Sequence, residues 1–228
     1  MIPLRDLNRR YSTPLITVLL IAINALVWFY ELSLGPRAGE QFLFVMGMVP
    51  ARLQEALHSP EVPLSAALIP LFTSMFLHSG WLHVIGNMWF LWVFGDNVED
   101  RFGHIPFLVF YLACGLGAGV IHTLFNWNSA VPAVGASGAI SGVLGAYLVM
   151  FPHARVITLV PLIFFFFTVQ LPAVVILGYW FVVQFLSGLS SLGSRESGGV
   201  AWWAHIGGFI LGMVVALMMP RKTYRVAY

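Results

Sequence analysis

The sequence predicts a helical, polytopic membrane protein with six transmembrane spans. Hydrophobic residues make up 59% of the 228 residues and charged residues only 9%, against about 25% charged residues in ordinary soluble domains. A chain with so few charges cannot cover a water-facing surface, which excludes a soluble globular domain. Apolar runs long enough to cross the hydrocarbon core, about 20 residues each, recur along the sequence.

Six apolar segments are predicted to span the membrane, and the fourth of them is short. They cover residues 14–32, 81–98, 105–125, 137–151, 172–189 and 199–219. Two further apolar runs, residues 62–77 and 156–171, are shorter than a span and contain Pro70 and Pro161. Because proline interrupts a helix, these two runs are predicted to be interfacial or re-entrant segments.

The distribution of basic residues favours six spans over eight. With a cytosolic amino terminus, six spans put eight of the 11 Lys and Arg residues inside and three outside, whereas eight spans would give six and five. The positive-inside rule prefers the first arrangement. Residues 1–13 and 220–228 are then cytosolic flanks of a membrane domain over residues 14–219. The short amino terminus favours a bacterial plasma membrane as the location.

This topology brings polar residues from three spans to one depth. Spans two, four and six all run from outside to inside. Ser137 begins span four, His205 lies about two turns into span six, and His83 and Asn87 lie in the first turns of span two. We therefore expect all four side chains in the outer part of the membrane, on the extracytoplasmic side.

Small residues predict that spans four and six pack directly against each other. Small side chains at four-residue spacing let helix backbones approach closely in lipid. The residues on the two faces are Gly138, Gly142 and Ala146 in span four, and Ala204, Gly208 and Gly212 in span six.

The pairing of Ser137 with His205 indicates nucleophilic hydrolysis. A serine alone is common between membrane helices, but an ionisable histidine within a span is a functional candidate, with a hydrogen-bonded structural role as the alternative. His205 could accept the Ser137 proton as the hydroxyl attacks a carbonyl. The Ser137 amide at the helix start, with His83 and Asn87 on one face of span two, could hold the oxyanion. No Asp or Glu lies within span six, which predicts a dyad rather than a triad.

Other chemistries lack their usual residues. His78 and His83 are five positions apart with no acid between them, so metal ligation is weakly supported. Cys114 is the single cysteine and is expected to be a small buried hydrophobe. Asp96 and Asp100, beside Glu99 and Arg101, are expected to form a solvated ion-pair cluster. A net charge of +2 gives no basis for nucleic-acid binding, and a transporter is the most remote alternative.

The combined motifs resemble those of the rhomboid intramembrane serine proteases, in their six-helix bacterial form. The resemblance rests on Gly135-Ala136-Ser137-Gly138, on Ala204-His205 followed by Gly208, and on the segment that contains His78, His83 and Asn87. It implies an endopeptidase that cleaves peptide bonds in or near transmembrane segments of other proteins. It also implies that neither a cofactor nor a metal is used, and that the partners are transmembrane substrates and the lipid bilayer.

The same resemblance assigns structural roles. His78 is implied to be structural, as are Glu99 and Arg101 at the cytosolic end of span two. The first loop, residues 35–80, is implied to lie partly in the outer leaflet. Substrates are implied to enter past span five and the loop of residues 190–200, whose Gly and Ser content suits either a mobile cap or an ordinary turn.

One position departs from the family pattern. Many members carry a tyrosine that stacks on the catalytic histidine, where this chain has Ser141. Trp202, Trp203 or a hydrogen bond from Ser141 are the expected substitutes. The alternative function is that of a catalytically silent relative that binds membrane proteins and controls their fate, for which loss of Ser137 or His205 would be the signature.

Overall fold

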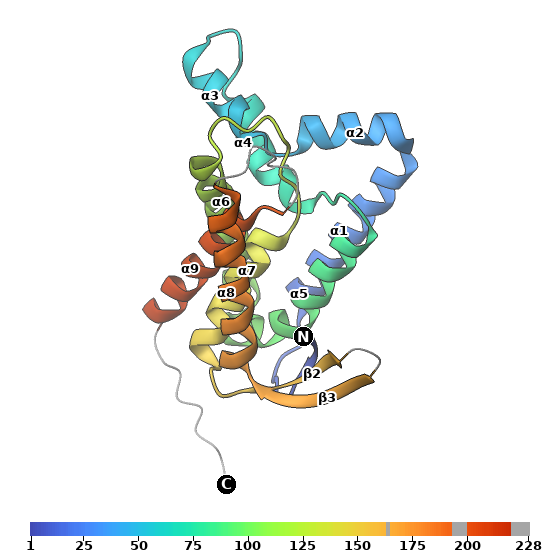
Figure 1. The fold of residues 1–228 in the computed structure, drawn as a ribbon, viewed down its shortest axis with the longest axis vertical. Helices are drawn as coiled ribbons and strands as arrows, with labels where there is room; N and C mark the ends of the chain where they lie inside the picture. Colours follow the sequence, from blue (N-terminus) through green and yellow to red (C-terminus); the bar gives the residue numbers. More distant parts are fainter. Residues whose placement is uncertain (163–164, 193–199, 220–228) are drawn as a thin grey trace.

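The protein is an elongated helical bundle with a small β-sheet at one end. The computed structural model describes residues 1–162, 165–192 and 200–219. In Figure 1 the sheet lies at the lower end of the bundle, and helices α2, α3 and α4 lie at the upper end. We refer to these as the sheet end (strands β1–β3) and the loop end (helices α2–α4).

Each of the six predicted spans coincides with one helix, and the helix ends differ from the predicted limits by only a few residues. These helices are α1 (Leu15–Ser33), α5 (Trp81–Phe102), α6 (His104–Phe125), α7 (Ser137–Met150), α8 (Ala173–Ser191) and α9 (Trp202–Met218). Among the described residues, α1, α6 and α8 are long and apolar enough to cross a membrane alone. Helices α7 and α9 are apolar but have only 14 and 17 residues, so the count of six spans stays a prediction.

The first loop folds into short helices that extend to the loop end. These are α2 (Gly35–Met46), α3 (Pro50–His58) and α4 (Ser65–Thr73), followed by the 3₁₀ turn η1 (Ser74–Phe76). The segment of α4 and η1 meets α5 at a bend of 76°. Within the predicted run of residues 62–77, Ser65–Phe76 is thus a short helical segment that turns sharply into α5. The Thr73 hydroxyl donates to the Met46 carbonyl at 2.6 Å, which ties α4 to the end of α2.

A three-stranded sheet is the part of the fold that the sequence analysis did not predict. Strand β2 (Arg155–Leu162) pairs antiparallel with both β1 (Ile2–Asp6) and β3 (Phe165–Pro172). The described residues of the apolar run 156–171, expected to be an interfacial or re-entrant segment, therefore lie in two antiparallel strands. The β-branched and aromatic residues of this run favour strands. Part of the predicted amino-terminal flank is likewise a strand, β1.

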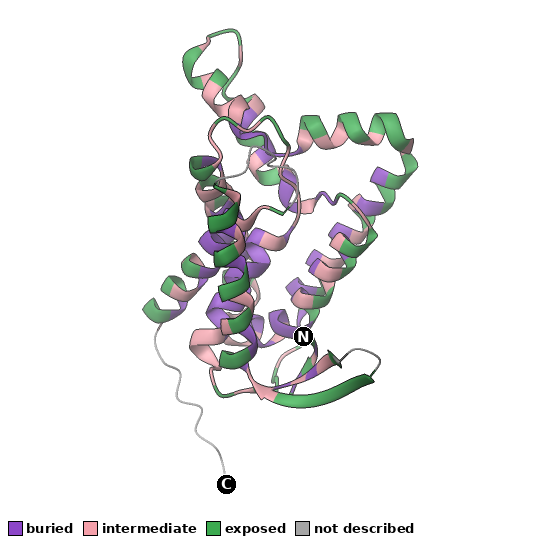
Figure 2. Ribbon diagram, in the orientation of Figure 1, coloured by how far each residue is buried: buried purple, intermediate pink, exposed green. Residues whose placement is uncertain are grey.

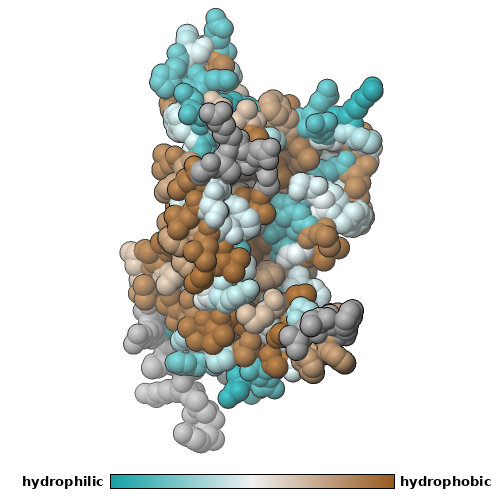
Figure 3. Space-filling view, viewed as in Figure 1, coloured by the Kyte–Doolittle hydropathy of each residue, from teal (hydrophilic) through white to brown (hydrophobic). Residues whose placement is uncertain are grey.

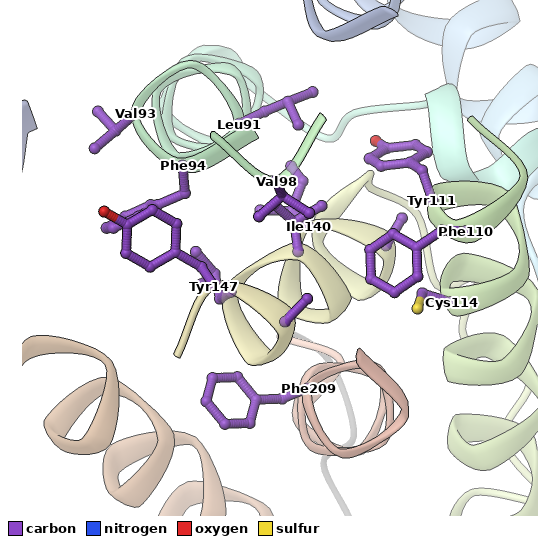
Figure 4. Close-up of a cluster of buried hydrophobic side chains, with 14 of the residues drawn as sticks. Leu91, Val93, Phe94, Val98, Phe110, Tyr111, Cys114, Ile140, Tyr147 and Phe209 are labelled. Atoms are coloured by element: carbon purple, nitrogen blue, oxygen red, sulfur yellow. The ribbon is translucent and has the colours of Figure 1, made fainter. Parts of the chain in front are cut away.

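Helix α7 lies at the centre of the bundle, where the core is densest. Its residues from Gly138 to Tyr147 are all buried, and Figure 2 shows buried residues concentrated on this helix, while α8 is largely exposed. Figure 4 shows the Phe94 ring of α5 beside Tyr147, with Phe209 of α9 also packed near α7. The Phe94 and Tyr147 ring centroids lie 5.0 Å apart in an edge-to-face arrangement.

The predicted contact between spans four and six is confirmed, because α7 makes its most extensive contact with α9. The two backbones touch: a Cβ on Gly212 would collide with the Gly142 carbonyl, and one on Gly145 with the Phe209 carbonyl. On its other side Gly142 faces Cys114, where a Cβ would lie 2.5 Å from the Cys114 Cβ. Cys114 is 2% exposed, in agreement with its predicted role as a small buried residue.

The surface fits a bilayer environment. Figure 3 shows hydrophobic residues over much of the middle of the molecule, beside a smaller hydrophilic area, and further hydrophilic residues towards both ends. Large apolar side chains are exposed along α8: Val174, Val175, Tyr179, Val182, Val183, Phe185, Leu186 and Leu189. Such a continuous apolar face has a favourable environment only in lipid or against another apolar surface. The protein is a membrane-embedded, multi-pass protein.

Glu99, near the end of α5, corrects one expectation. It is 1% exposed rather than solvated. Its carboxylate accepts hydrogen bonds from the backbone N–H groups of Ile16 (2.9 Å) and Thr17 (2.7 Å), and from the Thr17 hydroxyl (2.7 Å). Because the first N–H groups of a helix have no intrahelical partner, Glu99 of α5 caps α1. Asp96, by contrast, is half-buried and pairs with Arg10 at 3.6 Å.

Candidate active site

Ser137 and His205 meet across the contact between α7 and α9. The Ser137 Oγ atom lies 2.7 Å from Nε2 of His205, although the residues are 68 positions apart. The close approach of the glycine faces on the two helices brings these side chains together. His205 is 8% exposed. It lies in the first turn of α9, which begins at Trp202, and is therefore nearer the helix start than the sequence predicted.

The turn before α7 places Ser137 at the start of that helix. Gly135 has φ +125°, a backbone conformation that side chains rarely adopt. Its N–H donates to the Ser74 carbonyl at 2.9 Å, which holds the turn against η1. As the first residue of α7, Ser137 has a backbone N–H without an intrahelical acceptor. This N–H is therefore available to a ligand.

His83 and Asn87 of α5 converge on the same turn. A Cβ placed on Gly135 would lie 2.6 Å from Nε2 of His83 and 3.5 Å from Nδ2 of Asn87. Only glycine leaves this space free. Asn87 Nδ2 is buried and has no hydrogen-bond partner among the residues that the structure describes. The Ser79 N–H donates to His83 Nδ1 at 3.4 Å, which leaves Nε2 of a neutral His83 as the protonated nitrogen.

The environment of the His205 ring differs in part from the expectation. Trp180 of α8, which the sequence analysis did not single out, lies 5.9 Å from the ring, and Trp202 lies 6.2 Å away, edge-on. Trp203 instead stacks on Phe125. Of the two tryptophans expected to contact the histidine, Trp202 is thus the one whose ring lies beside it.

Two polar side chains complete this region. The Ser141 hydroxyl donates to the Ser137 carbonyl at 2.6 Å, so Ser141 is hydrogen-bonded within α7 and not to His205. Gln184 of α8 was not predicted as a site residue. Its Oε1 atom lies 2.7 Å from Nδ1 of His205. Among the described residues, the hydrogen-bond partners of the His205 ring are Gln184 and Ser137, and the dyad stays a prediction.

His78 is next to the site, because it contacts His83. It is 1% exposed, its backbone N–H lies 3.3 Å from both Glu31 carboxylate oxygens, and its ring contacts the His83 ring edge-on at 5.1 Å. These contacts fit the structural role that the resemblance implied. His78 and His83 do not belong to a group of three potential metal ligands, and the described residues contain no such group.

A cavity of about 540 Å³ opens beside Ser137 and His205. Apolar residues from three helices line most of it: Leu82, Gly86 and Phe90 of α5, Ile140 and Leu144 of α7, and Trp180 of α8. Asn87 and His83 supply polar groups on one side. An apolar cavity with a few convergent polar groups is the usual form of a substrate site. Most of the predicted cap, residues 190–200, lies outside the described residues.

Comparison with known proteins identifies the family. Residues 65–222 match the model of the rhomboid domain. The chain is 33% identical to the mitochondrial presenilin-associated rhomboid-like protein of Bos taurus, over 56% of this chain and 37% of that protein. It is 30% identical to the mitochondrial rhomboid protein 1 of Saccharomyces cerevisiae, over 64% of this chain and 40% of that protein.

A chloroplastic relative, rhomboid-like protein 11 of Arabidopsis thaliana, is 32% identical over 52% of this chain and 39% of its own length. The chain spans less than half the length of these curated relatives. The matched domain nevertheless includes α4 to α9 and every residue of the site described above. The chain belongs to the rhomboid family.

Proposed function

We propose that this protein is an intramembrane serine endopeptidase that uses Ser137 as nucleophile and His205 as general base. The observation that carries the proposal is the distance of 2.7 Å between Ser137 Oγ and His205 Nε2. This distance is within the hydrogen-bonding range that proton transfer requires. Membership of the rhomboid family, which typically consists of intramembrane serine proteases, supports the same activity.

The reaction would proceed by acyl transfer. The Ser137 Oγ–H proton moves to Nε2 of His205 as Oγ bonds to the substrate carbonyl carbon, and the carbonyl electron pair moves to oxygen. The C–N bond then breaks, and the proton on Nε2 passes to the leaving nitrogen. Water attacks the resulting ester in the same way, which releases the new carboxyl group and restores Ser137.

Three donors would stabilise the oxyanion. They are the backbone N–H of Ser137, Nε2–H of His83 and the Nδ2–H₂ group of Asn87. Asn87 Nδ2, which has no partner among the described residues, supports this role, because a buried donor without a partner is costly unless a ligand uses it. Preorganised donors of this kind stabilise a tetrahedral intermediate at no reorganisation cost.

The surroundings favour an apolar polypeptide as substrate. The cavity beside Ser137 is lined mostly by apolar side chains of α5, α7 and α8, and α8 has an exposed apolar outer face. A transmembrane segment of another protein has matching chemistry and could approach through the lipid past α8. We further propose that the loop end is extracytoplasmic and the sheet end cytosolic in a cell membrane, on the basis of the charge distribution.

The experiment is cleavage of single-span substrates by the purified protein in liposomes, beside its Ser137→Ala variant. Cleavage by the wild type alone, together with labelling of Ser137 by a fluorophosphonate, supports the proposal. A chelator should leave the activity unchanged. If the wild type neither cleaves the substrates nor reacts with the fluorophosphonate, but still binds transmembrane proteins, it is a catalytically silent binding protein and the proposed activity is wrong.

A further inference from the structure

Gln184 and His205 form a polar contact inside the membrane domain that takes no part in the reaction steps described for Ser137. Gln184 is a single polar residue in the middle of α8, whose sequence is otherwise almost entirely apolar, small or aromatic. It is 8% exposed, as is His205. Its amide oxygen Oε1 lies 2.7 Å from Nδ1 of His205, on the far side of the ring from Ser137. A buried polar group in a membrane helix is costly, which makes this contact a functional candidate.

We propose that Gln184 is the positioning residue for His205 and fixes the imidazole in the tautomer that the reaction needs. The inference rests on the proposed function, because it assigns Gln184 a role in that reaction. It places on α8 the orienting group that a carboxylate supplies in a Ser-His-Asp triad.

The chemistry of the two atoms determines the tautomer. An amide oxygen only accepts hydrogen bonds, so the nitrogen that faces it must be the one that carries the proton. With the proton on Nδ1, a neutral imidazole has a bare electron pair on Nε2. The Ser137 hydroxyl can then donate to Nε2, and Nε2 can receive the proton when Oγ attacks.

The opposite orientation of the Gln184 amide would oppose catalysis. An amide NH₂ group directed at Nδ1 would make Nδ1 the acceptor and put the proton on Nε2, facing Ser137. His205 could not then act as a base. Catalysis by His205 therefore requires that Oε1 of Gln184, and not its NH₂ group, faces Nδ1.

Trp180 supports the same function from the preceding turn of α8. Residues four positions apart lie on one face of a helix, so Trp180 and Gln184 both face His205. The centroid of the Trp180 ring lies 5.9 Å from that of the imidazole, so the two rings pack against each other. One face of α8 thus contacts the histidine both by packing and by hydrogen bonding.

The test compares Gln184→Leu and Gln184→Glu with the wild type in liposomes. Leucine is similar in size but accepts no hydrogen bond, whereas the glutamate carboxylate accepts from the same N–H. We expect Gln184→Leu to lower kcat by about 10-fold or more, because loss of the hydrogen-bond partner costs about 10- to 100-fold for a metal-ligating imidazole and about 10⁴-fold for the histidine of a Ser-His-Asp triad, with KM little changed. Gln184→Glu should restore most of kcat. Gln170→Leu, the same change at an exposed glutamine of β3, is the matched control.

A spectroscopic measurement separates orientation from general structural damage. The ¹⁵N chemical shifts of His205, assigned with a His205 variant, report which ring nitrogen carries the proton. We expect a protonated Nδ1 in the wild type and in Gln184→Glu, and a mixture of tautomers in Gln184→Leu. Unchanged kcat or an unchanged tautomer in Gln184→Leu would overturn the proposal. In either case wild-type cleavage that depends on Ser137 would leave the proposed function standing.

Discussion

Gly208 of α9 faces the backbone carbonyl of Gly138 in α7 so closely that no Cβ could fit between them. Gly138 directly follows Ser137 in α7, and Gly208 lies about one turn beyond His205 in α9. The contact therefore sets the separation of the helices at the level of the candidate site. Lipid provides no hydrophobic force between helices, so this packing itself holds the pair together.

Gly208→Ala should consequently destabilise the protein and reduce cleavage. The added methyl group meets backbone, which cannot rotate away, and overpacking of this kind costs about 1–3 kcal/mol. Thermal unfolding in detergent measures the first effect and kcat the second. Gly178→Ala on α8, where a Cβ would meet nothing within 4 Å, is the matched control. Equal unfolding temperatures for the two variants would contradict the close helix contact.

Ser137→Ala and His205→Ala should each abolish cleavage while leaving the unfolding temperature near that of the wild type. One residue supplies the nucleophile and the other its base, so they act as a unit. The double variant should therefore be no less active than either single variant. Ser65→Ala and His58→Ala, at exposed positions of the first loop, should retain full activity. Proteolysis by Ser137→Ala that is free of contaminating protease would end the serine mechanism.

The helices were predictable from sequence, because the thickness of the bilayer requires long apolar runs. Because the predicted spans place Ser137 and His205 at the same depth of the membrane, their convergence was also predictable. The pairing of β2 with β3 was not predicted, because an apolar run that is shorter than a span and contains Pro161 is also typical of an interfacial segment. Gln184 was missed although the rule that drew attention to His205, that polar groups within spans are costly, applies equally to it.

Contacts that depend on three-dimensional packing were beyond the sequence. Glu99 stands in a run of charged residues, which suggested solvation, but α1 packs against α5 and buries it. The tryptophan nearest His205 is Trp180 of α8. Nothing in the local pattern around Trp180 distinguishes it from a lipid-facing residue of the same helix.

Asn87→Ala and Asn87→Asp should both lower kcat and leave KM nearly unchanged. Each removes the Nδ2 donor, and loss of one oxyanion donor typically costs about 10²–10³-fold in kcat. Activity should not vanish, because His83 and the Ser137 N–H remain. The measurement is a kinetic comparison with one substrate in one lipid composition. If Asn87→Asp, which keeps the shape of the side chain, is fully active, Asn87 has only a structural role in α5.

Glu99→Gln should lower the stability of the protein by about 1–3 kcal/mol, because buried backbone donors of α1 would lose part of their acceptor. Pro14 precedes α1 and offers no side-chain cap of its own. Thr17→Val, which removes the hydroxyl that also donates to Glu99, should have a smaller effect in the same direction. Thermal unfolding is the measurement, with Glu40→Gln at an exposed position as the control. Identical unfolding temperatures for all three variants would exclude the capping role.

Asp6 should make the stability of the sheet end depend on pH. It lies in β1, outside the membrane-spanning helices, and accepts hydrogen bonds from the Tyr147 hydroxyl (2.7 Å) and from Nδ2 of Asn97 (2.8 Å). Burial raises the pKa of Asp6 from 3.8 to about 6, and its hydrogen bond from Tyr147 only partly offsets this rise.

Between about pH 4 and pH 6 the folded protein thus binds more protons at Asp6 than the unfolded chain does, so the free energy of unfolding falls as pH rises through this window. Asp6→Asn keeps an acceptor oxygen but cannot titrate, and it should remove this part of the slope. Unfolding is measured across the window in a detergent with a non-titrating headgroup, with Glu61→Gln as an exposed control. A slope in Asp6→Asn equal to that of the wild type would assign the pH dependence to another group.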